Sequence, residues 1–446
     1  MSKKVNTMFP TLAEQPTKAV SAKGCVITDE NGKEYLDCSA GVSVVGIGHG
    51  VQEIRDAVVE QMDKVSFIYR GLFSNDAALR LSEQIIEMAP EGMERVFYCS
   101  GGSEATESAI KIARQYHVER GNSAKWTVLS KWQEFHGSTA IGLSVSGRGN
   151  WSTMFEPYLT PMPRVPQCNC YQCSLKMKYP SCGIRCAYEL ERIIRGEGPS
   201  TVSAFIFETV GGGTTGALQP PKEYYPIVRE ICDKYDVLMI DDEIITGFGR
   251  TGKNFAIDHY GVSPDMILTA KGMSSGYLPI GSVILAKKIV DTIEQGSGSV
   301  LHSFTFAGHA VSCAAASAVL TYLNENDLVR QSAVKGEYFL KKLQTLLDLP
   351  MVGKVRGLGL MLGIVFVQDK ETGESYPPEL KIGDTVSEYC REHGVMLLSV
   401  TTGSEDGIKG DAVTCTPPLI ITEEQIDRVV DVLREAILDT YEKKVK

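Results

Sequence analysis

The sequence contains no apolar run that approaches the roughly 20 residues needed for a membrane-spanning helix. Its first residues, MSKKVNTMFPTLAEQPTK, have no apolar core of a secretory signal. An excess of basic residues is also absent, because the formal net charge is −10. This charge argues against nucleic acid or an anionic membrane as the main partner. Together these absences predict a cytoplasmic protein.

Internal repeats, low-complexity tracts and long linkers are missing as well, yet 446 residues exceed the roughly 250–300 at which a single core stops growing. Short apolar runs alternate with helical patterns, which indicates an α/β fold. Residues 201–209, 235–243 and 95–100 are predicted buried parallel strands, and residues 355–367 a further strand. Helices are predicted after residue 100, over 327–348 and over 423–444; the buried face of the first consists of Ala105, Ala109, Ile112, Ala113 and Tyr116.

The arrangement of apolar runs and helical patterns along the chain predicts a large α/β domain with a mostly parallel central sheet, and a smaller α+β domain built from both chain ends. The large domain is expected over residues 61–325. The smaller domain would combine residues 1–60 with residues 326–446.

Three short motifs suggest chemistry. In YCSGGSEATESAIKIAR a strand runs into glycines and a serine before a helix, so Gly102 and Ser103 could bind a phosphate at the positive helix end. The alternative is an ordinary turn with a serine cap. In YDVLMIDDE two aspartates end an apolar strand, at the edge where α/β sheets bind ligands. Strand alternation means that Asp241 and Asp242 cannot point the same way.

The third motif is MILTAKG, in which Lys271 follows an apolar segment. A lysine in an apolar setting has a lowered pKa and can act as a nucleophilic amine that forms a Schiff base. A solvated lysine at a strand end is the alternative.

The order of these motifs resembles the class III aminotransferases, which use pyridoxal 5′-phosphate (PLP). The resemblance covers nearly the whole chain and rests on these segments: ITDENGKEYLDCSAG, IGHG, SGGSEA, EFHG, FET, DDEIITGFGRTG, AKG, FTFAGH, VRGLGLMLGI and PPLIIT. It implies the fold type I of PLP-dependent transferases. It also implies transfer of an amino group from an amine donor to a 2-oxoacid such as 2-oxoglutarate or pyruvate.

The resemblance assigns roles by position. Lys271 would bind PLP covalently and move the proton, and Asp242 would pair with the pyridinium nitrogen. Thr305 would reach the phosphate of a neighbouring subunit, which implies a homodimer or a dimer of dimers. The other expected cofactor contacts are Gly102 and Ser103 at the phosphate, Phe135 and Ile244 at the ring faces, His136, and Glu208. Thr209 stands where the family usually has proline, so the local backbone could differ.

Two departures from the family concern the donor. Ser43 occupies a position where members acting on ω-amino acids commonly have tryptophan. No arginine lies between Arg391 and Pro417 to clamp a carboxylate, and an insertion occupies residues 401–411. Lys409 is a point charge and cannot replace the arginine fork. Either the donor lacks a free carboxylate, or Arg70 or Arg250 supplies the clamp.

The first alternative suits a β-aminoacyl-CoA such as 3-aminobutyryl-CoA, as in amino-acid fermentation. Free ω- or β-amino acids and diamines such as putrescine are the other candidates. A PLP aminomutase that keeps its product bound is a further alternative, and it would consume no 2-oxoacid. A regulatory protein built around the cysteines is disfavoured, because Lys271 and Asp242 are both present.

Five of the twelve cysteines lie in CNCYQCSLKMKYPSCGIRC, residues 168–186, an insertion in the large domain. Two close pairs, Cys170 with Cys173 and Cys182 with Cys186, have the spacing of a structural zinc site. An iron–sulfur cluster is less compatible with this spacing. Reduced cysteines in a compact loop without metal are the alternative.

Overall fold

A computed structural model describes residues 7–9, 16–147, 152–404 and 407–446. Its centre is a sheet of seven strands, in which β5 to β9 pair in parallel and β10 is antiparallel to both neighbours. In sheet order the strands are β4 (Met93–Cys99), β10 (Gly281–Ala286), β9 (Met266–Thr269), β8 (Leu238–Asp242), β7 (Val202–Phe207), β5 (Thr127–Lys131) and β6 (Arg164–Val165). This arrangement confirms the predicted α/β fold with a mostly parallel central sheet.

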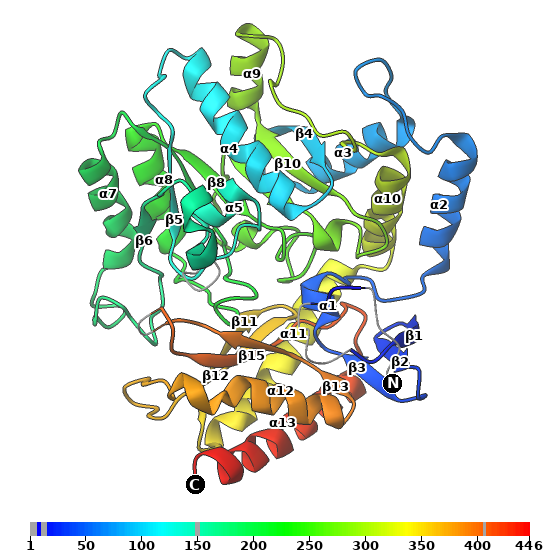
Figure 1. The fold of residues 1–446 in the computed structure, drawn as a ribbon, viewed down its shortest axis with the longest axis vertical. Coiled ribbons are helices and arrows are strands. Elements are labelled where there is room, and N and C mark those ends of the chain that lie inside the picture. The colour runs from blue at the N-terminus through cyan, green and yellow to red at the C-terminus, as the bar shows by residue number, and fades with distance from the viewer. Residues whose placement is uncertain (1–6, 10–15, 148–151, 405–406) are drawn as a thin grey trace.

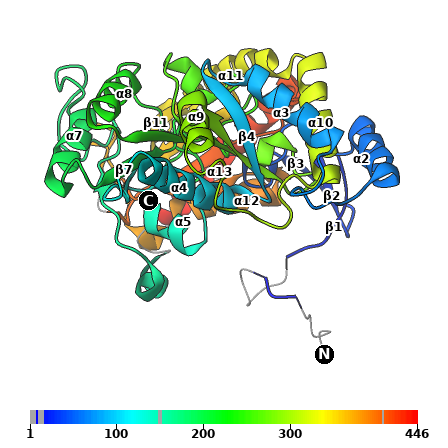
Figure 2. The same ribbon diagram turned by 90° about the horizontal axis from the view of Figure 1, so that it is seen from above.

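Helices cover both faces of this sheet (Figures 1 and 2). Because side chains alternate along a strand, Leu238 and Ile240 of β8 join the core of one face, whereas Met239 joins the core of the other. The first face is covered by α4 (Gly102–Glu119), α5 (Ala140–Val145) and α9 (Lys287–Gln295). The second is covered by α3 (Asp76–Met88), α7 (Arg185–Glu197), α8 (Tyr224–Tyr235) and α10 (Ala310–Glu325). The five residues predicted for the inner face of α4 are all buried.

The rest of the chain forms two four-stranded sheets beside the central one (Figure 1). The first joins β1 (Ala19–Lys23), β2 (Val26–Asp29) and β3 (Glu34–Asp37) to β13 (Val395–Met396) from the other chain end. The second is antiparallel, in the order β11 (Val352–Leu358), β12 (Met361–Phe366), β15 (Asp411–Cys415) and β14 (Leu398–Thr401). It packs against α11 (Leu328–Gln344), α12 (Ile382–Glu392) and α13 (Glu423–Lys444).

Two local predictions need correction. Residues 355–367 form not one strand but the hairpin β11–β12, because Gly359 takes a left-handed conformation with φ 54° and turns the chain. The strand at residues 95–100 is β4, whose only partner in the sheet is antiparallel, because β10 reverses direction beside it.

Helix α2 (Gln52–Lys64) packs on α10, although residues 52–60 fall in the segment predicted for the small domain.

No helix among the described residues is long and apolar enough to cross a membrane.

Candidate active site

A cavity of about 200 Å³ lies where β7, β8 and β9 end and α4 begins. Eight of the nine residues predicted to contact the cofactor line it: Gly102, Ser103, Phe135, His136, Glu208, Asp242, Ile244 and Lys271. They come from five separate parts of the chain. The strand-end motifs therefore meet at one place, as parallel strands with a shared carboxyl edge require.

One end of the cavity is the start of α4. Its N-cap, Gly101, has no side chain to accept from the first backbone N–H groups, so the positive end of an 18-residue helix has no internal cap. A Cβ atom on Gly102 would lie 2.8 Å from Cδ1 of Ile244, so a larger residue would require the Ile244 side chain to shift. The Ser103 hydroxyl already accepts from the N–H of Ser138 at 3.0 Å. This end fits a phosphate group.

The other end of the cavity is the end of β8. Oδ2 of Asp242 lies 2.7 Å from Nδ1 of His136, and both side chains are buried. Asp241 points to the opposite face, where it accepts from the Thr209 hydroxyl at 2.7 Å. The predicted split of the two aspartates is therefore confirmed. Asp242 fits a protonated ring nitrogen, and the residue that replaces the family's proline has its own role at Asp241.

Lys271 follows β9 and stands in a sparsely populated conformation with φ 35°. Its Nζ donates to the carbonyl of Val42 at 3.1 Å. Val42 has a φ of 68°, which is unusual for a β-branched residue. The backbone is therefore strained at both Lys271 and Val42. Burial lowers the pKa of Lys271, although Glu208 and Asp242 attract its charge. A partly neutral amine is what attack on a carbonyl carbon requires.

Glu208 lines the cavity beside the place expected for the cofactor ring. Its carboxylate accepts from the backbone N–H of Phe135 at 3.0 Å and of Gly212 at 2.6 Å. Burial, together with repulsion from Glu134 and Asp242, raises the pKa of Glu208 to about 7. The cavity therefore holds a carboxyl that changes charge near neutral pH.

This raised pKa predicts a pH-dependent stability. The unfolded carboxyl loses its proton near 4.5 and the folded one near 7, so its contribution to stability is present at low pH and is lost as the pH rises through 7. Relative to Glu208→Gln, the wild type should lose about 2–3 kcal/mol of unfolding free energy between about pH 5 and 9. Urea unfolding of the cofactor-free proteins measures this difference. The exposed Glu197→Gln should show no such trend, and a flat difference for Glu208→Gln would refute the raised pKa.

Four predicted residues lie outside the cavity. Thr305 is exposed, and Arg70 is bonded to Ser303 at 3.1 Å and stacked on the Phe97 ring at 5.0 Å. Ser43 is buried, with its hydroxyl 3.0 Å from that of Thr416. Arg250 is not available as a clamp, because its guanidinium is buried and donates to the carbonyls of Leu360 and Pro417.

The structure does not support the predicted zinc site. The cysteines of segment 168–186 surround a cavity of only about 20 Å³. Across the described ranges no group of three or more His, Cys, Asp or Glu side chains is placed to hold a metal ion. Instead of the predicted quartet Cys170, Cys173, Cys182 and Cys186, the buried Cys168 interacts with Cys170 and Cys186. All five cysteines are free thiols.

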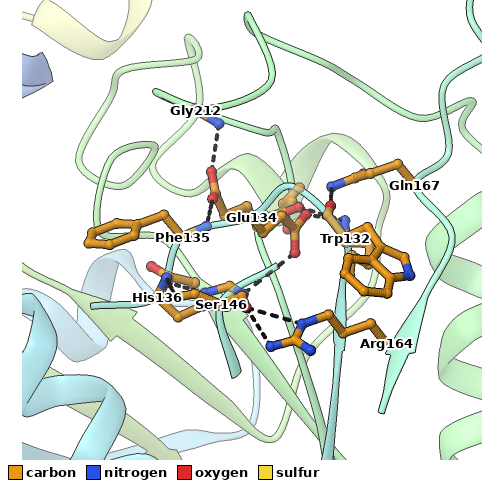
Figure 3. Close-up of polar contacts among 12 residues, drawn as sticks. Trp132, Glu134, Phe135, His136, Ser146, Arg164, Gln167 and Gly212 are labelled. Carbon is orange, nitrogen blue, oxygen red and sulfur yellow. Dashed lines mark hydrogen bonds and ion pairs between the residues drawn. The ribbon is translucent and has the colours of Figure 1, made fainter. Parts of the chain in front are cut away.

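The sequence interpretation overlooked two buried charges beneath the cavity. Lys131 ends β5, and Glu134 stands directly before Phe135 (Figure 3). The charged atoms of Lys131 and Glu134 are 2.7 Å apart. The only sign in the sequence is the spacing Lys-x-x-Glu directly before Phe-His-Gly. Such a spacing on its own fits a solvated pair equally well. The apolar walls formed by Val210 and Ile245 were also missed.

A helix end that fits a phosphate, a strand-end aspartate and a half-buried lysine around one cavity define a PLP-dependent enzyme of fold type I. The chain belongs to the class III aminotransferase family, whose model matches residues 11–437. It is therefore an aminotransferase, and members of this family depend on PLP.

Individual relatives support the same assignment. The chain is 34% identical to the uncharacterized aminotransferase YodT of Bacillus subtilis over 95% of both chains. It is 34% identical to the putrescine–pyruvate aminotransferase of Pseudomonas aeruginosa, over 97% of this chain and 93% of that one. An amine transaminase from an uncultivated Pseudomonas species, solved with PLP bound, superposes with a TM-score of 0.91 at 31% identity over 99% of each chain.

Proposed function

We propose that the amine donor of this aminotransferase has no free carboxylate near its reacting amine. The observation that carries this proposal is the charge of the cavity lining, in which Lys271 and His136 are the basic side chains among the described residues and His136 already faces Asp242 and Glu134. Glu208 and Asp242 add negative charge beside it. A donor carboxylate would lie among these groups without a cationic partner, and such a burial is costly.

A second cavity supports a donor with an extended uncharged arm. This groove, of about 440 Å³, is lined by Trp132, Gln133, Pro166, Gln167, Asn169, Gln172, Ser174, Leu175, Thr215, Leu218, Thr402, Gly403, Ser404 and Gly407. None of these side chains is charged, and four carry carboxamides. Gln133 is two residues from Phe135, and the turn that bears Thr215 and Leu218 begins at Val210, in the wall of the first cavity.

A β-aminoacyl-CoA such as 3-aminobutyryl-CoA combines these properties, because a thioester replaces the carboxylate and an amide-bearing arm follows it. The acceptor would be a 2-oxoacid such as 2-oxoglutarate or pyruvate. Putrescine is the second candidate, since its other ammonium group could pair with Glu208. The named activity of the Pseudomonas aeruginosa relative favours this alternative.

The residues of the chain divide the work as follows. The start of α4, with Gly102 and Ser103, would hold the PLP phosphate, and Asp242 would hold the ring nitrogen in its protonated form. When bound, PLP supplies the electron sink for the charge that develops on the carbon beside the amine. Lys271 Nζ takes the proton from that carbon and returns it in the next step. Phe135 and Ile244 line the cavity and would shield the reacting atoms from water.

We also propose a homodimer. Thr305 and Arg70 lie on an exposed apolar surface, in which Phe67 packs on Phe306 at 5.8 Å between ring centres. Other exposed members of this surface are Tyr69, Leu72, Phe73 and Leu301. A patch of this kind marks an interface. A second copy seated on it could receive Thr305 at its phosphate site, as the family resemblance implies.

The donor proposal is tested by comparing 3-aminobutyryl-CoA, free 3-aminobutyrate and putrescine at equal concentration, with pyruvate or 2-oxoglutarate as acceptor. Formation of alanine or glutamate is measured. We expect kcat/KM for the thioester to exceed that for the free acid by at least about tenfold, since an unpaired buried carboxylate costs more than 1.4 kcal/mol. Equal rates for the free acid and the thioester would contradict the proposal.

A variant of the groove provides the matched control. Ser174 is exposed at the groove, so Ser174→Phe should fill it without disturbing the core. It should lower the thioester's kcat/KM by about tenfold and leave that of the short putrescine unchanged. Loss of both activities together would place the groove outside donor recognition.

A further inference from the structure

Glu134 is a fully buried carboxylate in the loop between β5 and α5. Within the described part of the chain, neither of its oxygens accepts a well-aligned hydrogen bond. Two nitrogens stand beside it instead. Nζ of Lys131 lies 2.7 Å from Oε1. Nε2 of His136 lies 3.6 Å from Oε2 (Figure 3). Burying a carboxylate costs free energy unless charged or hydrogen-bonding partners compensate it. Lys131 and His136 are the two partners that stabilise the charge of Glu134.

Lys131 is held firmly on its side of Glu134. Its Nζ donates to the carbonyl of Glu208 at 3.0 Å and to the Tyr225 hydroxyl at 3.3 Å. It also lies within 5.6 Å of the ring centre of Phe207. Although burial by itself would raise the pKa of Glu134, attraction to Lys131 and His136 lowers it below the ordinary value. Glu134 is therefore anionic at neutral pH.

His136 lies between two carboxylates. Its Nδ1 is 2.7 Å from Asp242 Oδ2, and its Nε2 faces Glu134. A carboxylate accepts hydrogen bonds and donates none, so both ring nitrogens must carry hydrogen to satisfy both neighbours. Other charges near this ring come from Lys131, Glu208 and Lys271; these have mixed signs. Burial disfavours the imidazolium, but Asp242 and Glu134 together raise the pKa of His136 to about 10.

We propose that Glu134, fixed by Lys131, is a positioning residue that keeps His136 doubly protonated and directs its Nδ1–H at Asp242. The charges then alternate from the end of β5 to the site of the ring nitrogen, in the order Lys131, Glu134, His136 and Asp242. Asp242 is held as a carboxylate in one orientation, which is what pairing with a cationic ring nitrogen requires. This inference concerns the cofactor side of the cavity and holds for any amine donor.

The first test needs no variant. The protein is prepared without cofactor, with ¹⁵N in the histidine rings on a deuterated background, and His136→Asn identifies the signal of His136. Both ring nitrogens of His136 should be protonated in the wild type throughout the range from about pH 6 to 9. A single ring proton at neutral pH would overturn the proposal.

The second test is Glu134→Gln, which keeps the shape and removes the charge. His136 should now lose one ring proton with a midpoint below about pH 8. Glu134→Asp retains a carboxylate and should keep both protons. Glu189→Gln removes a carboxylate of similar burial on α7 and should not affect His136. An unchanged His136 in folded Glu134→Gln would show that the Lys131–Glu134 pair is merely structural.

The double variant Lys131→Met/Glu134→Gln guards against misfolding, because it leaves no stranded charge behind. Its His136 should titrate like that of Glu134→Gln. It should also bind PLP more weakly, by about tenfold in the dissociation constant measured by fluorescence. Retention of both ring protons in the folded double variant would equally overturn the proposal.

Discussion

Replacing Lys271 with alanine is expected to lower kcat for amine transfer by at least about 10⁴-fold, the largest effect of any single change in this chain. Lys271 carries the only amine in the lining of the described cavity, so no neighbouring amine can take its place. On the proposed roles, the variant would lose both the covalent attachment of PLP and the group that moves the proton. Steady-state formation of alanine or glutamate from the preferred donor measures the loss.

Two controls support that experiment. Lys253→Ala removes an exposed lysine and should leave kcat within about twofold of wild type. Borohydride reduction of the wild type with PLP should label the peptide that contains Lys271 and no other. A Lys271→Ala enzyme that retains more than a few percent of wild-type kcat would refute the assignment of this residue.

Asp242→Asn should reduce kcat/KM by about 10²–10³-fold. The neutral amide cannot balance a cationic ring nitrogen, and it loses the charge that faces His136 at 2.7 Å. Because the side chains are nearly isosteric, the cavity shape is kept and the change acts through charge. The defect should appear mainly in kcat, since the charge matters most when electrons move into the ring.

The preceding residue offers a matched control. Asp241 is equally buried and bonded to Thr209, and burial with repulsion from Glu243 raises the pKa of its carboxyl well above the ordinary range. Its side chain points away from the cavity, so Asp241→Asn changes a carboxyl of the same strand without altering the site of the ring nitrogen. Its kcat/KM should change by less than about threefold. Equal losses in the two variants would mean that β8 is merely disrupted.

Much of the fold and of this cavity could be predicted from the sequence because it depends on local rules. Continuous apolar runs predicted β7 and β8, and strand alternation separated Asp241 from Asp242. Parallel strands bring their carboxyl ends together, so motifs more than a hundred residues apart met at one edge. The buried face of α4 could also be predicted, because helical spacing is a local rule.

The parts that were missed depend on contacts that no local pattern encodes. The ion pair of Lys131 and Glu134 is buried because β5 ends beside β7, where Lys131 contacts the Glu208 carbonyl and Tyr225 of α8. The hairpin at Gly359 depends on one left-handed residue within an apolar run. Cysteine spacing suggested zinc, but the fold of segment 168–186 brings Cys168 close to Cys170 and Cys186 and forms no metal site among the described residues.

Amine transfer at Lys271 is tested most directly by a single turnover. Purified protein loaded with PLP is mixed with 3-aminobutyryl-CoA or putrescine in the absence of a 2-oxoacid, and the carbonyl product is quantified. One carbonyl product per protomer should form, and later addition of pyruvate or 2-oxoglutarate should recover the amino group as alanine or glutamate. A PLP-loaded protein that forms no carbonyl product from either amine, or one whose Lys271→Ala variant forms as much, would contradict amine transfer at this site.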